Sequence, residues 1–136
     1  MASIRLLAGL MIAAGGTGLA ACGGSSGGGT SPSPGLTCST LPNSTTILIV
    51  NNAVCPSALT VPRGTRVTFI NNDSRAHEMN SDPHPEHTDC PELAQVGFLQ
   101  PGQSRQTGNL NTPRTCGYHD HGLFQVQSLR GQIIIQ

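Results

Sequence analysis

The sequence predicts an all-β fold, an antiparallel β-sandwich of roughly a hundred residues that spans positions 36–136. Two observations lead to this prediction. Short runs rich in β-branched and apolar residues recur along the chain, and Gly, Pro and Asn turns separate them. Helical periodicity is almost absent over the same region. Many short strands with no helix between them are typical of a sandwich.

The expected strands follow one another at short intervals. A turn at 62–64 separates the expected strands at 58–61 and 65–70, and another turn at 101–102 precedes the expected strand at 105–110. The segment 71–92 holds three prolines and little apolar content, so we expect a long loop there, and long ordered loops are usually functional. The predicted strands are residues 45–50, 58–61, 65–70, 93–99, 105–110 and 128–136, with residues 112–118 leading into a histidine-rich motif.

The N-terminal region has the features of an export signal. Arg5 precedes an apolar stretch at 6–14 that is too short to span a bilayer. Residues 19–22 (Leu-Ala-Ala-Cys) resemble a bacterial lipobox, which implies cleavage before Cys22 and acylation of that cysteine. We therefore expect a lipoprotein signal peptide at 1–21, and a flexible Gly/Ser/Pro tether at 22–35 that includes the lipidated cysteine. The domain at 36–136 would then lie in the bacterial cell envelope, on its periplasmic or extracellular face.

Charge is unusual in its placement. The chain has no lysine, and all seven acidic residues and all five histidines lie between positions 73 and 121. The formal net charge is zero and no basic patch is present, so nucleic acid is not an expected partner. The crowding of carboxylates and imidazoles in one window favours a cation site.

Cysteine usage indicates an oxidising compartment. With Cys22 assigned to lipid, four cysteines remain, and an even number in an exported chain predicts two disulfides. Four cysteines permit three pairings. We expect Cys38 to pair with Cys55, and Cys90 with Cys116.

A thiol and two imidazoles fall within six residues, in Cys116-Gly-Tyr-His119-Asp-His121. His77 follows another strand-like run some forty residues earlier. Sulfur and nitrogen ligands from separate segments suit a soft or borderline metal ion. On an extended segment, residues two apart point the same way, so His119 and His121 can reach one ion. Asp120 between them either orients a ring through a hydrogen bond or faces solvent.

Four fragments resemble the cupredoxin family in their order and spacing. The resemblance covers residues 45–136, nearly the whole domain. The resemblance implies a Greek-key β-sandwich with a copper site. The fragments are V-x-x-G-x-x-V-x-F-x-N-x-D at 61–73 followed by His77, L-x-P-G-x-S at 99–104, Cys116-x-x-His119, and a closing strand L-x-G-x-I-x-I at 129–135.

The resemblance also implies a ligand set, from which this chain departs. Blue-copper cupredoxins use two histidines, a cysteine and usually an axial methionine; here these would be His77, His119 and Cys116. No methionine follows Cys116, and Phe124 and Leu129 occupy the places where one is expected. His84, His87 and His121 are additional.

Two arrangements of one copper ion, or of zinc, remain open. In the first, Cys116 is a thiolate ligand and the site transfers electrons. In the second, Cys116 pairs with Cys90 and the metal is held by histidines: His77, His119 and His121, with His84 or His87 as a fourth ligand.

The expected function is that of an envelope-anchored copper-binding protein, not an enzyme, which carries electrons or copper. Its expected partners are the membrane, through the lipid, and a redox or copper-exchange protein. Two alternatives remain open. One is a histidine-ligated copper or zinc enzyme similar to superoxide dismutase, and the other is a structural domain without metal.

Overall fold

The computed structural model describes residues 32–136. The expected signal peptide, Cys22 and the tether as far as residue 31 lie outside the described residues. Within the described part of the chain, no helix is long and apolar enough to cross a membrane. The described end of the tether contacts the domain, because the Ser33 backbone N–H donates to Asn72 Oδ1 at 2.6 Å.

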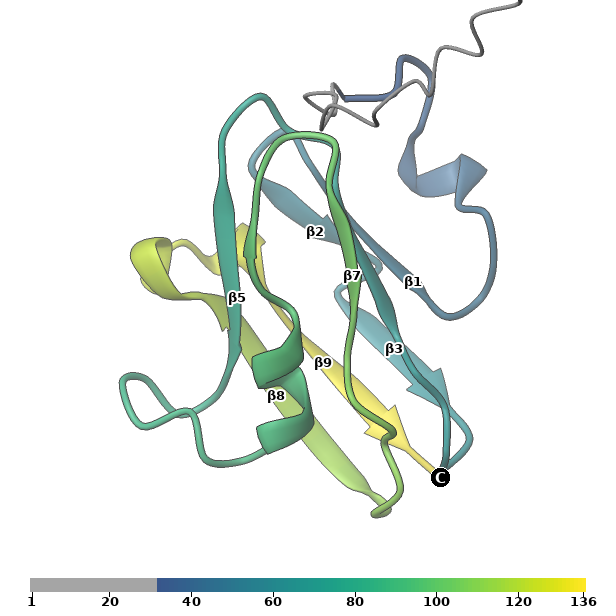
Figure 1. Ribbon diagram of the computed structural model, residues 1–136, viewed down its shortest axis with the longest axis vertical. Coiled ribbons are helices and arrows are strands. Elements are labelled where there is room, and N and C mark those ends of the chain that lie inside the picture. Colours follow the sequence, from purple (N-terminus) through teal and green to yellow (C-terminus); the bar gives the residue numbers. More distant parts are fainter. Residues whose placement is uncertain (1–31) are drawn as a thin grey trace, which may run out of the picture.

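Two sheets form a β-sandwich, as the sequence predicts (Figure 1). The first sheet has the order β2 (Ala53–Cys55), β1 (Thr46–Val50), β4 (Thr68–Asn71) and β7 (Ser104–Gln106). The second has the order β3 (Ala58–Val61), β9 (Arg130–Ile135), β8 (Arg114–Asp120), β5 (His77–Ser81) and β6 (Gly97–Leu99). Both sheets are mixed rather than purely antiparallel, because β1–β4 and β3–β9 are parallel pairs. Four short 3-10 helices complete the described fold: η1 (Cys38–Thr40), η2 (Pro91–Gln95), η3 (His121–Leu123) and η4 (Gln127–Leu129).

The core lies between the sheets and is built mainly from aliphatic side chains. Phe69 of β4 meets Tyr118 of β8 edge to face, with ring centroids 5.2 Å apart. This contact joins the two sheets, and edge-to-face geometry is favourable for aromatic pairs. The buried cluster contains Ile47, Ile49, Val54, Leu59, Val61, Val67, Phe69, Met79, Cys90, Leu93, Val96, Leu99, Leu110, Cys116, Tyr118, Leu129, Ile133 and Ile135.

The structure differs from the sequence prediction in the segment 71–92, which is not one long loop. Residues His77–Ser81 form β5, in which burial alternates so that His77, Met79 and Ser81 point inward. Two of these inward side chains are polar, which hides the alternation of an ordinary strand. The expected strand at 93–99 is partly the 3-10 helix η2, which begins at a proline, and only its last three residues form β6.

Both disulfides have the expected pairing. Cys38 bonds to Cys55 and ties η1 to β2. Cys90 bonds to Cys116 and ties the segment after β5 to the middle of β8. The second disulfide fixes one end of the loop that carries two of the candidate ligands.

Candidate metal site

The candidate site is built on the end of β8, where side chains alternate between two faces. Tyr118 and Asp120 lie opposite Ser81 and Met79 of β5, and all four face the core. The alternation of a strand therefore places His119 on the other face. His119 is nevertheless buried, because residues 82–90, which follow β5 in the sequence, pack over that face.

The residues between β5 and η2 form a loop that is fastened to β8 at both ends. We call residues 82–90 the histidine loop. At its start, the Asp82 backbone N–H donates to the Gly117 carbonyl at 3.0 Å. At its end, Cys90 is joined to Cys116. Inside the loop, the His87 backbone N–H donates to the Pro83 carbonyl at 2.8 Å.

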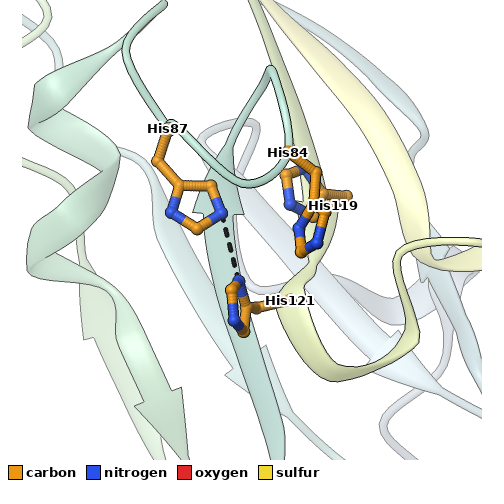
Figure 2. Close-up of side chains that lie close together, drawn as sticks. All are labelled: His84, His87, His119 and His121. Atoms are coloured by element: carbon orange, nitrogen blue, oxygen red, sulfur yellow. Dashed lines mark hydrogen bonds between the residues drawn. The ribbon is translucent and has the colours of Figure 1, made fainter.

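The histidine loop brings two imidazoles to the end of β8 (Figure 2). The ring centroid of His119 lies 5.4 Å from that of His84 and 5.2 Å from that of His87. His121, the first residue of η3, adds a fourth ring. These four residues, the four-histidine group, each offer a ligand nitrogen, and the four nitrogens lie within 4.8 Å of one another. Nitrogens around a tetrahedral ion with ~2.0 Å bonds are about 3.3 Å apart, so the group is close to ligating geometry.

Asp82 determines which nitrogen of His119 faces the group. His119 Nδ1 lies 2.6 Å from Asp82 Oδ1. Because a carboxylate only accepts hydrogen bonds, Nδ1 donates, and Nε2 of the neutral ring carries a lone pair. His119 Nε2 is buried and has no hydrogen-bond partner. A carboxylate behind a histidine in this way is typical of metal ligands.

Gly117 allows Asp82 to reach that position. A Cβ at residue 117 would lie 2.3 Å from Asp82 Oδ2, far inside van der Waals contact. Arg130 of β9 lies on the same carboxylate, with its guanidinium 3.6 Å from Oδ1. Gly117 therefore leaves room for the Asp82 carboxylate, and Arg130 forms an ion pair with it.

The other three rings also present nitrogens to the group. His84 Nδ1 is buried and unpartnered. His121 Nδ1 and His87 Nε2 lie 3.1 Å apart, and only one of these two nitrogens can carry the proton they share. Buried polar atoms are nearly always paired in folded proteins, so the unpartnered nitrogens of His84 and His119 indicate that a ligand binds there.

Protonation also favours a metal ion. The pKa of His84 is lowered by partial burial first, and then by the nearby His121 and His119 rings. The pKa of His87 is lowered by burial and by His119, His121 and His84. Neutral imidazole is the form that binds metal, so the lowered pKa values of His84 and His87 favour metal binding at these two rings.

Phe124 borders the group on the side of His84. The two rings stack at 4.0 Å between centroids with an interplanar angle of 5°. Phe124 is 37% exposed, so this edge of the site faces solvent. Stacking restricts the orientation of the His84 ring.

His77, which the sequence predicts as a ligand, lies apart from the four-histidine group. Its side chain is buried on the core face of β5, where Nδ1 lies 2.6 Å from Asp120 Oδ2 and Nε2 lies 3.3 Å from Asp73 Oδ2. The physical reason is strand register. His77 shares the inward face of its strand with Met79, which pairs with Asp120, whereas His119 points to the opposite face.

Cys116 is not available as a thiolate, because it is disulfide-bonded. Met79, the methionine nearest to the site in sequence, is fully buried in the core. The first sequence arrangement, with a sulfur ligand, is therefore not the one that the structure has. The four-histidine group shares only part of the second arrangement: it contains His119 and His121 together with both His84 and His87, but not His77.

Motif spacing does not reveal Asp82 as a partner of His119. The two residues lie 37 positions apart, and only the pairing of β5 with β8 brings them together. Asp120, placed by the sequence between two ligands, bonds to His77 and to η3 rather than to a ring of the group.

The mixed two-sheet sandwich, with its site at the end of β8, is a cupredoxin-like fold. Among solved structures, the chain is similar to a mutant of amicyanin in its Cu(I) form, with a TM-score of 0.53 and 16% identity over 74% of this chain and 90% of that one. It is also similar to a purple cupredoxin from Nitrosopumilus maritimus, with a TM-score of 0.51 and 19% identity over 68% and 99% of the two chains. The oxidised plastocyanin from Dryopteris crassirhizoma gives a TM-score of 0.53 and 17% identity over 67% and 99%. No protein-family model and no curated protein matches the chain.

The residues present fit a divalent metal but not a blue-copper centre. Four imidazoles, two with buried unpartnered nitrogens, suit copper(II) or zinc. The thiolate that defines a blue-copper site is absent from the group, since Cys116 is oxidised. The fold and the histidine group together fit a copper-binding protein.

Proposed function

We propose that this protein binds one copper ion in the four-histidine group and carries it at the cell envelope, without catalysing a reaction. One observation carries the proposal. Four imidazole nitrogens from two distant segments converge within 4.8 Å, and two of the rings bury a nitrogen that nothing else satisfies. The cupredoxin-like fold supports copper over other divalent ions, because the similar solved structures are cupredoxins.

The choice between copper carrying and electron transfer rests on the ligand set. A cysteine thiolate is part of the electron-transfer sites of blue-copper proteins. The four-histidine group contains only imidazoles, which suit copper(II) better than copper(I). Such a site favours holding and releasing copper(II), and a copper-exchange protein is the partner that this activity requires.

Attachment to the envelope is proposed from the sequence at positions 19–22. Acylated Cys22 would anchor the chain, and the residues that follow would let the domain meet a partner along the membrane surface. Labelling with a radioactive fatty acid in a bacterial host tests this. Label and membrane association should both be lost in Cys22→Ser, and equal label in the two chains would contradict anchoring at this residue.

Copper binding is tested by equilibrium titration of the purified protein against a competing chelator. We expect one copper(II) ion per chain, and a large loss of affinity in His87→Ala. Thr88→Ala is the matched control, since Thr88 is exposed on the same loop. Equal affinity in His87→Ala and the unmodified protein would contradict the site, and absence of copper uptake by the unmodified protein would contradict the function.

A further inference from the structure

We propose that His77 is a positioning residue that holds His121 in the metal site through Asp120, although His77 is not itself a ligand. This inference rests on the proposed function, since it concerns the same metal site. Three contacts carry it. They form a continuous path from the turn after β1, through the core, to the Leu123 backbone N–H of η3, the 3-10 helix whose first residue is His121.

The first contact joins His77 to Asp120. His77 Nδ1 lies 2.6 Å from Asp120 Oδ2, and both side chains are almost completely buried. Since the carboxylate accepts, His77 donates this hydrogen bond. A short bond to a buried carboxylate is among the stronger interactions in a protein, so the position of Asp120 is coupled to that of His77.

The second contact joins Asp120 to η3. The other carboxylate oxygen, Oδ1, accepts from the Leu123 backbone N–H at 3.1 Å. Asp120 is thus the N-cap of η3, and the first residue of that helix is His121. One carboxylate therefore fixes both the end of β8 and the start of the turn that carries the ligand.

The third contact joins the other nitrogen of His77 to Asp73. Its Nε2 lies 3.3 Å from Asp73 Oδ2, and the same oxygen accepts from the Asn52 backbone N–H at 2.7 Å. Asp73 lies after β4 and Asn52 lies in the turn between β1 and β2. His77 consequently connects the first sheet to the metal-bearing end of the second.

Loss of His77 should affect one ligand, His121, more than the other three. Asp120 would keep its burial but lose a hydrogen-bond partner, which makes its present position costly. The cap of η3 would then loosen, and His121 would move. His119 is held by Asp82, and the histidine loop that carries His84 and His87 is held at both ends to β8, so these three ligands should move less than His121.

The test compares His77→Asn with His77→Leu. The asparagine amide reaches the place of Nδ1 and can donate to Asp120, whereas leucine fills the space without a donor. We expect His77→Leu to weaken copper(II) binding about 10- to 100-fold, the range typical of outer-sphere partners, and His77→Asn to restore most of it. Electron paramagnetic resonance of the copper(II) protein should show fewer coupled nitrogens in His77→Leu and the original pattern in His77→Asn.

The outcomes separate this inference from the proposed function. Failure of the unmodified protein to bind copper removes the function. Normal copper binding in the unmodified protein, with unchanged affinity and nitrogen coupling in a folded His77→Leu, overturns the positioning role alone. Equal loss in His77→Asn and His77→Leu, with both chains folded, would overturn it in favour of direct ligation by His77.

A measurement on the unmodified chain keeps the test valid if His77→Leu does not fold. Zinc(II) is diamagnetic, so nitrogen-15 resonance of the imidazoles can be followed as it is added. We expect the four rings of the group to show metal-bound nitrogens, while His77 keeps its Nδ1 proton. A metal-bound nitrogen on His77 would overturn the inference.

Discussion

The Asp82 carboxylate is the single side chain that most directly prepares a ligand. It accepts from Nδ1 of His119 and leaves Nε2 of that buried ring open. A carboxylate of this kind orients the ring of a metal-binding histidine. We expect its effect to depend on position and not on charge alone, because Asp82 is the loop acid that is hydrogen-bonded to His119.

Replacement of Asp82 tests this assignment. We expect Asp82→Asn to weaken copper(II) binding about 10- to 100-fold, because the amide leaves the tautomer of His119 unfixed. Asp89→Asn is the control, since Asp89 is exposed on the same loop and its removal changes the net charge equally. Competition titration measures both. If the two variants lost the same affinity, the effect of Asp82 would be general electrostatics.

The closeness of His119 and His121 is predictable from the sequence, whereas the exclusion of His77 is not. The two histidines are only two positions apart, and in the structure His119 lies in β8 while His121 begins η3 directly after it. The face on which His77 lies depends on the register between β5 and β8, and a shift of one residue would reverse it. No local pattern in positions 71–92 specifies that register.

At the scale of elements, the histidine loop contains no helix or strand, and its position is fixed by its attachments to β8. One end pairs with the Gly117 backbone and the other is disulfide-bonded. Release of either end should let His84 and His87 move away from β8. Cys116, which the sequence motif places where a metal thiolate is expected, is thus part of a disulfide. That disulfide holds the loop that carries His84 and His87.

Removal of this disulfide should therefore reduce both stability and copper affinity. The paired change Cys90→Ala and Cys116→Ala opens a loop with a sequence separation of 26, and we expect a loss of about 3 kcal/mol in the free energy of unfolding. Urea unfolding measures the stability, and competition titration measures the affinity.

The other disulfide is the matched control. Cys38→Ala with Cys55→Ala opens a comparable loop, with a sequence separation of 17, that holds no member of the four-histidine group. It should lower stability by about as much while copper affinity is kept. Equal affinity losses in the two paired variants would show that the Cys90–Cys116 bond has no particular role at the site.

At the scale of the whole molecule, the fold class is predictable from apolar runs and the turns that separate them. The runs at 45–50 and 58–61, with their Gly and Pro turns, correspond to β1 and β3. The parallel pairings of β1 with β4 and of β3 with β9 are not encoded locally, because they join segments that the chain connects through other elements. Local patterns show where strands occur, and the packing of the core selects their neighbours.

Copper should stabilise the whole molecule because only the folded chain assembles the site. Two of the ligands lie on the histidine loop and two at the end of β8, more than thirty positions later in the sequence. At free copper(II) concentrations about 100 times the dissociation constant, the expected gain in the free energy of unfolding is about 2.7 kcal/mol. Scanning calorimetry should show an unfolding temperature that rises with copper concentration, and His87→Ala should lose most of that rise. A rise of equal size in both chains would place the stabilising ion elsewhere.

The central claim, that copper is held by histidines alone, is tested most directly by electron paramagnetic resonance and visible absorption of the protein loaded with one equivalent of copper(II). We predict a pale protein whose spectrum is that of type-2 copper with nitrogen ligands and no thiolate. An intense blue thiolate-to-copper band, or a spectrum identical to that of copper free in the buffer, would contradict the account.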